Sequence, residues 1–154
     1  MHRNIILAAL LLAAAVVLAA CASGAEPTEV PAAGLTIDAA ALSESPAFID
    51  WDEGGTAMQI IARRDAGGAV RLAFNTCQSC GGSPYAWFED LGDGTLQCQN
   101  CGLLFPLDAV GVEKATGCNP VTFSDFTVEG DVVTVPAALL AENAARFANW
   151  KKFE

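Results

Sequence analysis

Alternating apolar and polar residues predict three β-hairpins. In the first, "TAMQIIARR" and "AVRLAFN" flank "DAGG", and Val70, Leu72 and Phe74 recur at the period of a half-buried strand. The stretch "AFIDW" before this hairpin is predicted to be a third strand. The second hairpin joins "YAWFED" to "TLQCQ" through a Gly-Asp-Gly turn, and "FTVEGDVVTV" forms the third around Glu129 and Gly130.

One helix is predicted near the C-terminus, in "PAALLAENAARFANWKK". Pro136 opens it, Leu140, Ala144 and Phe147 share one face, and the lysines in its last turn complement the helix dipole. Together these elements predict a small β-rich α+β domain. Its core is thin, so a metal or a covalent clamp would be a sensible supplement to its stability.

The N-terminus is predicted to be a signal peptide, residues 1–20. The apolar run Ile5 to Ala20 has 16 residues, fewer than the ~20 of a spanning helix. Leu18-Ala19-Ala20-Cys21 resembles the lipobox of bacterial lipoproteins, which would make Cys21 a lipid anchor on the extracytoplasmic face of the membrane. The alternative is a secreted protein cleaved after Ala20.

Residues 21–34 are predicted to be a flexible tether, and residues 35–154 a single domain.

Charge and composition exclude several functions. Cleavage after residue 20 leaves seven Lys or Arg and eighteen Asp or Glu, a net charge of −11, which disfavours nucleic acid as a partner. The only histidine is His2, within the signal peptide. A mature chain without histidine cannot form a Ser-His or Cys-His nucleophile or a histidine-ligated metal site, so we expect no enzyme of these classes.

Two Cys-x-x-Cys pairs give the strongest chemical signal. Cys77 and Cys80 are separated from Cys98 and Cys101 by seventeen residues, within the window of roughly 15 to 20 typical of four-cysteine metal sites. A hairpin between the pairs would bring them together as knuckles, as in a zinc ribbon or a rubredoxin. Zinc, iron or an iron-sulfur centre, and disulfides remain open as occupants.

The fifth cysteine of the predicted domain, Cys118, does not fit a four-ligand site. It lies in "GCNP", where glycine and the Asn-Pro turn shape a tight loop. It could be a fifth ligand, a thiol that exchanges with one of the four, or a buried thiol without a role in metal binding.

Several neighbouring residues are candidates for supporting roles. Gly81 and Gly102 follow the second cysteine of each pair, where a side chain would crowd the turn. The hairpin tip carries acids that could offer iron a weak oxygen site but fit solvated turn residues better. These acids are Glu89, Asp90 and Asp93. We expect Tyr85 and Trp87 to share one strand face and to pack beside the knuckles.

The ordered motifs resemble one known family. "NTCQSC", "LQCQNCG", "FPLDAVG", "GCNP" and "GDVVTVP" closely resemble the FtrD-like family of bacterial membrane iron-sulfur proteins, over roughly Ala47 to Leu140. The resemblance implies a role beside an iron permease in ferrous-iron uptake, with an iron-sulfur centre that passes electrons. By position, it implies that the four cysteines of the two pairs and Cys118 form the metal site.

The leading interpretation is therefore a lipid-anchored, extracytoplasmic cysteine-metal protein that transfers electrons or handles iron. The alternative is a binding module with a purely structural zinc ribbon, which docks on a membrane transporter. A thiol-disulfide carrier is disfavoured, because neither Cys-x-x-Cys pair opens a helix, where a thiol would gain a low pKa.

Overall fold

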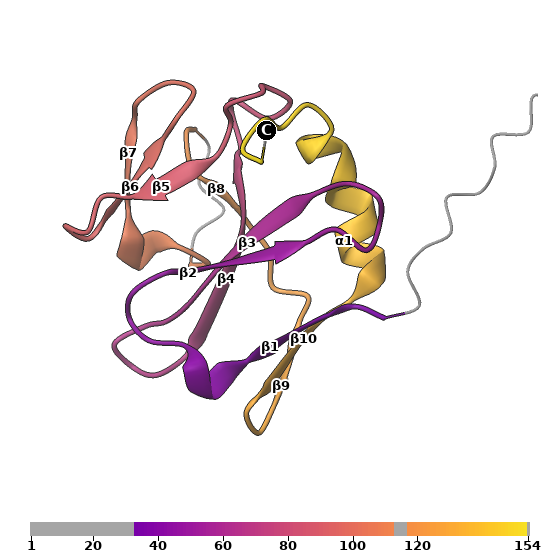
Figure 1. Cartoon of the computed structure of the whole chain (residues 1–154). Helices are drawn as coiled ribbons and strands as arrows, with labels where there is room; N and C mark the ends of the chain where they lie inside the picture. Colours follow the sequence, from indigo (N-terminus) through magenta and orange to yellow (C-terminus); the bar gives the residue numbers. More distant parts are fainter. Residues whose placement is uncertain (1–32, 113–116, 154) are drawn as a thin grey trace, which may run out of the picture.

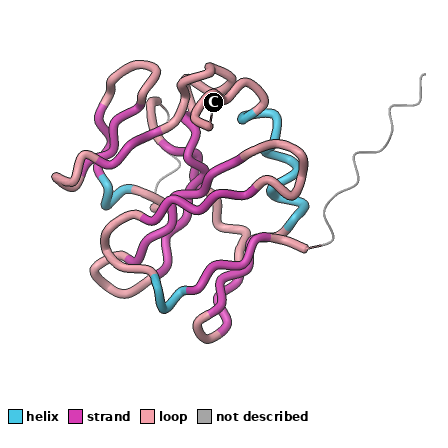
Figure 2. The backbone as a smooth tube through the Cα atoms, in the orientation of Figure 1, coloured by secondary structure: helices cyan, strands magenta, loops and turns pink. Residues whose placement is uncertain are grey.

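A computed structural model of the chain describes residues 33–112 and 117–153 (Figure 1). The predicted signal peptide, Cys21 and nearly all of the predicted tether lie outside these residues. No helix within them is long and apolar enough to cross a membrane. The described part of the chain is rich in strands and has a single α-helix near its C-terminal end (Figure 2).

The described residues form ten strands in three antiparallel sheets. The strands are β1 (Leu35–Asp38), β2 (Ala47–Trp51), β3 (Met58–Arg64), β4 (Val70–Cys77), β5 (Phe88–Asp90), β6 (Thr95–Cys98), β7 (Leu104–Pro106), β8 (Pro120–Thr122), β9 (Thr127–Glu129) and β10 (Val132–Val135). The sheets have the orders β2-β3-β4-β8, β5-β6-β7 and β1-β10-β9. Helix α1 spans Ala137–Asn143, and short 3-10 helices span Ala39–Ala41, Leu107–Ala109 and Ala144–Phe147.

The four-stranded sheet lies at the centre of the fold, and both of its faces are covered. Ile60 on β3 pairs with Phe74 on β4, and both point into a first core; the next pair, Ile61 and Ala73, points into a second core. All three predicted hairpins and the strand "AFIDW" are confirmed. The prediction that β4 is half-buried is wrong. The sheet β5-β6-β7 covers the second face of this strand and buries Ala73 and Asn75.

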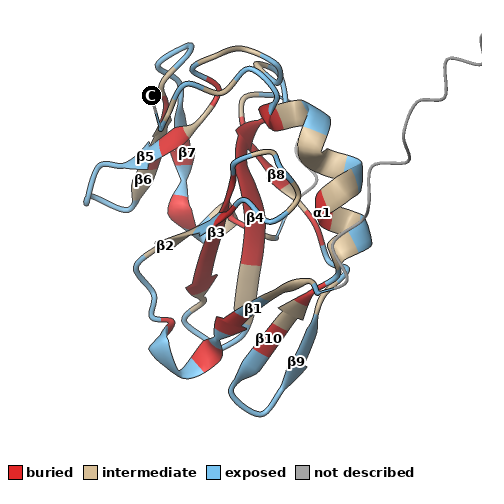
Figure 3. Ribbon diagram, turned by 45° about the vertical axis from the view of Figure 1, so that its right-hand side comes forward, coloured by how far each residue is buried: buried red, intermediate tan, exposed pale blue. Residues whose placement is uncertain are grey.

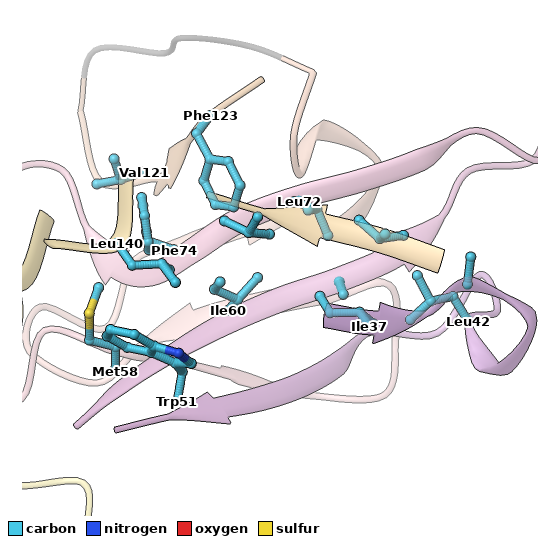
Figure 4. Packing of buried hydrophobic residues seen from close by; sticks show 14 of the residues in the cluster. Ile37, Leu42, Trp51, Met58, Ile60, Leu72, Phe74, Val121, Phe123 and Leu140 are labelled. Carbon is cyan, nitrogen blue, oxygen red and sulfur yellow. The ribbon is translucent and has the colours of Figure 1, made fainter. Parts of the chain in front are cut away.

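The first core lies between the central sheet, the sheet β1-β10-β9 and helix α1 (Figures 1 and 4). Phe74 is completely buried within it. Its ring centroid lies 4.5 Å from that of Phe123 and 6.0 Å from that of Phe147. Leu140 of α1 is also completely buried. The apolar face that the sequence predicts for the helix is therefore the face that closes this core.

The second core lies between the central sheet and the sheet β5-β6-β7, on the side opposite α1 (Figure 3). Phe88, Leu96 and Phe105 supply its apolar side chains from the three short strands. Cys77 and Cys98 belong to the same core and are completely buried. The cysteine pairs are thus anchored in packed structure, each by its first residue.

Helix α1 is shorter than the sequence predicts. It ends at Asn143, whose side-chain amide donates to the carbonyl oxygen of Leu139 at 2.9 Å and whose Oδ1 accepts a bond from Arg146. Asparagine side chains compete in this way with the backbone bonds of a helix, and a 3-10 turn follows. Lys151 and Lys152 lie beyond that turn, so they do not complement the helix dipole as expected.

The 3-10 turn after β7 is fastened to the central sheet at two points. The buried Arg63 donates to the Leu107 carbonyl oxygen at 2.6 Å and to the Asp108 carboxylate at 3.0 Å. Gly111 has φ +70°, and a Cβ there would lie 2.9 Å from the Leu72 nitrogen. Only glycine fits this approach, which accounts for the glycine of "FPLDAVG".

We expect Phe74→Ala to lower the free energy of unfolding by about 3–5 kcal/mol, because it leaves a cavity in the first core. Phe153→Ala is the matched control: that ring is half exposed and makes one edge contact with Trp150, so its loss should cost about 1 kcal/mol. Urea denaturation followed by circular dichroism measures both. Equal effects of the two substitutions would contradict this description of the core.

Candidate metal centre

The first Cys-x-x-Cys turn continues directly from β4. Cys77 is the last residue of that strand, and its amide donates to the Ala86 carbonyl oxygen at 2.7 Å. The chain then turns so that the Cys80 amide points at the Cys77 sulfur, with a nitrogen-to-sulfur distance of 3.4 Å. An amide directed at sulfur stabilises the thiolate form, as a metal ligand requires.

The second turn repeats this arrangement at the end of β6. Cys98 is the last residue of the strand; burial raises the pKa of its thiol, and the amides of Cys101 and Asn100 lower it in part. The Gly102 amide donates to the Cys98 carbonyl oxygen at 2.8 Å, with φ +73° at Gly102. The expectation that a side chain would crowd the turn at Gly102 is wrong. A Cβ there would meet nothing within 4 Å, so it is the left-handed backbone that favours glycine.

Cys118 reaches the same place through the pairing of β8 with β4. Pro120 pairs with Cys77, and the Asn119 carbonyl oxygen accepts a bond from the Gln78 amide at 2.8 Å. These two contacts align the Cys118 loop with the first turn. The Cys118 sulfur lies 3.3 Å from the Cys77 sulfur.

Four sulfur atoms form a compact group of possible ligands. Those of Cys77, Cys80, Cys98 and Cys118 all lie within 4.8 Å of one another. Four thiolates around one tetrahedral ion, with bonds of ~2.3 Å, lie about 3.8 Å apart, so this donor set fits a thiolate-bound metal. The Cys101 sulfur falls outside the group but contacts Cys118 at 3.0 Å, and Cys101 is exposed.

Burial and hydrogen bonding shift the pKa values of four of the thiols, in opposite directions. Burial raises the pKa of Cys118 and of Cys98, and it raises the pKa of Cys80 to about 12. Cys101 is the opposite case: the hydrogen bond from Cys118 lowers its pKa to about 7. Without a cation, Cys80, Cys98 and Cys118 therefore favour the neutral form, and Cys101, at the exposed edge, favours negative charge more than they do.

One buried amide sets the distance between the two turns. Asn75, two residues before Cys77, accepts from the Phe88 amide at 2.8 Å and donates to the Phe88 carbonyl oxygen at 3.1 Å. It also donates to Gln59 at 2.7 Å. Because Phe88 pairs with Cys98 across β5 and β6, this side chain links β4 and Cys77 to the strand that carries Cys98.

The C-terminal segment supports the loop that follows Cys80. The Asn149 side chain donates to the Gly82 carbonyl oxygen at 3.1 Å, and the Lys151 amide donates to the Pro84 carbonyl oxygen at 3.0 Å. The Lys152 ammonium lies 5.4 Å from the centre of the Trp87 ring. These contacts hold the loop between the first turn and β5 against the end of the chain.

The two aromatic residues of this loop precede a strand instead of belonging to one. Tyr85 and Trp87 precede β5, so the expectation that they share a strand face is wrong. Their rings lie 5.7 Å apart, and the Trp87 ring makes an edge contact with Trp150 at 5.9 Å. Tyr85 is half exposed.

The acids of the second hairpin make the contacts of ordinary turn residues. Asp90 accepts from the Gly92 amide, and Asp93 accepts from the amide and hydroxyl of Thr95, which lowers the Asp93 pKa. Glu89 is exposed and lies 4.0 Å from the Lys152 ammonium. Among the described residues, the group of possible metal ligands is formed by cysteines alone.

Comparison with known families identifies the chain. The family described as "Membrane iron-sulfur containing protein FtrD-like" matches residues 42–147, well over half of the chain. The chain belongs to the FtrD-like family. Comparison with curated proteins and with solved structures found no match.

Membership of the FtrD-like family confirms the resemblance carried by the sequence motifs. The family description names a membrane protein that contains iron and sulfur. The cysteine group gives this FtrD-like chain a donor set of the corresponding kind. Family and geometry together indicate iron-related metal binding by a membrane-associated protein.

Replacing Asn75 by leucine should lower the free energy of unfolding by about 3 kcal/mol, because the amide and carbonyl of Phe88 and the amide oxygen of Gln59 all lose its side chain as partner. Asn149→Leu is the control, since it removes one exposed hydrogen bond and should cost less than about 1 kcal/mol. Chemical denaturation of the metal-free protein gives both values. If Asn75→Leu lowered the free energy of unfolding no more than the control does, the link that Asn75 makes between β4 and β5 would be refuted.

Metal affinity should fall as the pH is lowered. The thiols with raised pKa values carry protons at neutral pH and must release them to become ligands, so protons compete with the ion. We expect the affinity for Zn²⁺ to fall more than about tenfold per pH unit between pH 8 and pH 6, which corresponds to more than one proton released per ion. Competition with a chromophoric chelator measures it, and a pH-independent affinity would argue against thiol ligands.

Proposed function

We propose that this protein is a lipid-anchored, extracytoplasmic iron protein that transfers electrons or handles iron for a ferrous-iron uptake system. One observation carries the proposal: four thiol sulfurs from three separate segments lie within 4.8 Å of one another. In a family described as containing iron and sulfur, a donor set made only of sulfur is best explained as the iron site.

The spacing of the sulfurs favours a single iron ion over a cluster. Several iron and sulfide atoms would hold the thiolates further apart than one ion does, and the observed group is compact. The two turns, each with amides pointing at the sulfur of its first cysteine, would act as knuckles of the zinc-ribbon or rubredoxin kind. A single ion could also be acquired after export of an unfolded chain.

The residues of the chain would bind the ion and tune its potential. Iron in such a site supplies reversible one-electron chemistry. The thiolates would hold the ion, and the amides directed at Cys77 and Cys98 would stabilise negative charge on sulfur. Exposure of Cys101 leaves one edge of the group open, which shortens the path from the centre to a partner at the surface.

The location and the partners are part of the proposal. Cys21 would carry the lipid, and residues 21–34 would let the domain 35–154 reach an iron permease or another uptake component in the same membrane. The protein would work as a carrier or binding protein rather than as an enzyme. Its acidic composition would keep it from binding nucleic acid.

A structural zinc site is the second candidate, and one observation favours it. Two of the four grouped cysteines are completely buried in the second core, which is where a closed, redox-silent ion would add stability to a small domain. The protein would then be a binding module whose surface docks on a membrane transporter.

Metal content and the visible spectrum distinguish the two. We expect the exported Cys21→Ser protein, purified without oxygen, to contain one iron with thiolate charge-transfer bands that bleach on reduction and return on oxidation. Cys98→Ser should abolish them, whereas Ser83→Ala, a nearby change outside the thiols, should leave them intact. One colourless zinc per chain would contradict the electron-transfer function and support the structural alternative.

A further inference from the structure

We propose that the permanent ligands of the metal are Cys77, Cys80, Cys98 and Cys118, and that Cys101 is an exchange thiol through which the ion enters and leaves. This assignment rests on the proposed metal-binding function and specifies which thiols perform it. It differs from the ligand set that the two Cys-x-x-Cys pairs predict, because it replaces Cys101 by Cys118.

Geometry separates the two cysteines first. The four sulfurs that lie within 4.8 Å of one another include Cys118 and omit Cys101. A tetrahedral ion accepts four thiolates, so five thiols cannot all bind at once. The set that already has the dimensions of a four-ligand site is the one that contains Cys118.

Burial supports the same division. Cys77 and Cys98 are completely buried, Cys80 and Cys118 are partly buried, and Cys101 is exposed. Water can solvate a thiolate at the exposed position, but a thiolate at the inner positions needs a cation to offset the cost of burial. The ion therefore stabilises the four inner thiolates far more than it stabilises Cys101.

The backbone holds the two competing cysteines differently. Cys118 is fixed beside Cys77 by the pairing of Pro120 and by the bond from the Gln78 amide to the Asn119 carbonyl oxygen. Cys101 lies in an exposed local turn, which the Gly102 amide closes on the Cys98 carbonyl oxygen. The side chain that an ion at the surface reaches first is therefore that of Cys101.

The contact between the two sulfurs provides a route for exchange. At 3.0 Å, Cys101 lies close enough to Cys118 to bond to an ion as Cys118 releases it. In this step the metal–sulfur bond to Cys118 breaks, the bond to Cys101 forms, and the proton of the Cys101 thiol passes to Cys118. No electron is transferred, and reversal of the step loads the inner site.

Alkylation of the unaltered domain tests the ligand set without relying on a variant that could fail to fold. The exported Cys21→Ser protein is loaded with one equivalent of Zn²⁺, treated with iodoacetamide, and mapped by mass spectrometry. We expect Cys101 to be modified and the other four cysteines to be protected, whereas all five react after chelation and denaturation. Protection of Cys101 with modification of Cys118, or protection of all five, would overturn the assignment.

A matched pair of variants tests the exchange. Cys118→Ser should weaken Zn²⁺ binding by more than about 100-fold, because removing a ligand should cost more than removing a residue that only supports a ligand. Cys101→Ser should change the affinity by less than about threefold. Transfer of the bound ion to a chelator should be at least about tenfold slower in Cys101→Ser than in the parent, which an inert surface thiol would not produce. Equal transfer rates would refute the exchange role. Because Zn²⁺ is used, the result is independent of whether iron and electron transfer are the natural function.

Discussion

The hydrogen bonds between the Asn75 side chain and the backbone of Phe88 are the constraint on which the cysteine site depends. The domain has two cores on opposite faces of one sheet, and the strands that carry Cys77 and Cys98 belong to different sheets. Asn75 joins those sheets, because it lies two residues before Cys77 and bonds to Phe88, the residue that pairs with Cys98. A bidentate bond to the backbone fixes both the distance and the orientation of β5, which sulfur ligands require before an ion can bind them.

The second core makes this constraint effective. It is small, and two of its completely buried members are thiols that will also have to carry charge when a metal binds. In the absence of a cation, burial keeps the pKa values of Cys80 and Cys98 high, so the packed structure tolerates them as neutral groups. The same residues thus serve as apolar packing in one state and as ligands in the other, and the fold need not rearrange between them.

Local signals explain what the sequence predicted correctly, and long-range contacts explain the rest. The hairpins were predictable because the alternation of apolar residues and the turn glycines lie within a few residues of one another. The helix was predicted to be too long because the bonds of Asn143 compete with helix propensity. The second buried face of β4 depends on a sheet formed more than ten residues later, and no periodicity within β4 reports it. Cys118 was the hardest case, since its place beside Cys77 depends on the pairing of β4 with β8, about forty residues apart.

The contacts of the C-terminal segment with the loop after Cys80 make the support of the cysteine site depend on residues that carry no ligand. All five cysteines of the domain precede Asn149 and Lys151 in the sequence. The side chain of Asn149 and the amide of Lys151 donate to the carbonyl oxygens of Gly82 and Pro84, and these bonds hold the loop after the first turn. A chain truncated before Asn149 would therefore keep every thiol of the domain but leave the first turn without this support. Proteolytic trimming of the C-terminal segment would thus weaken the site without removing a single sulfur atom.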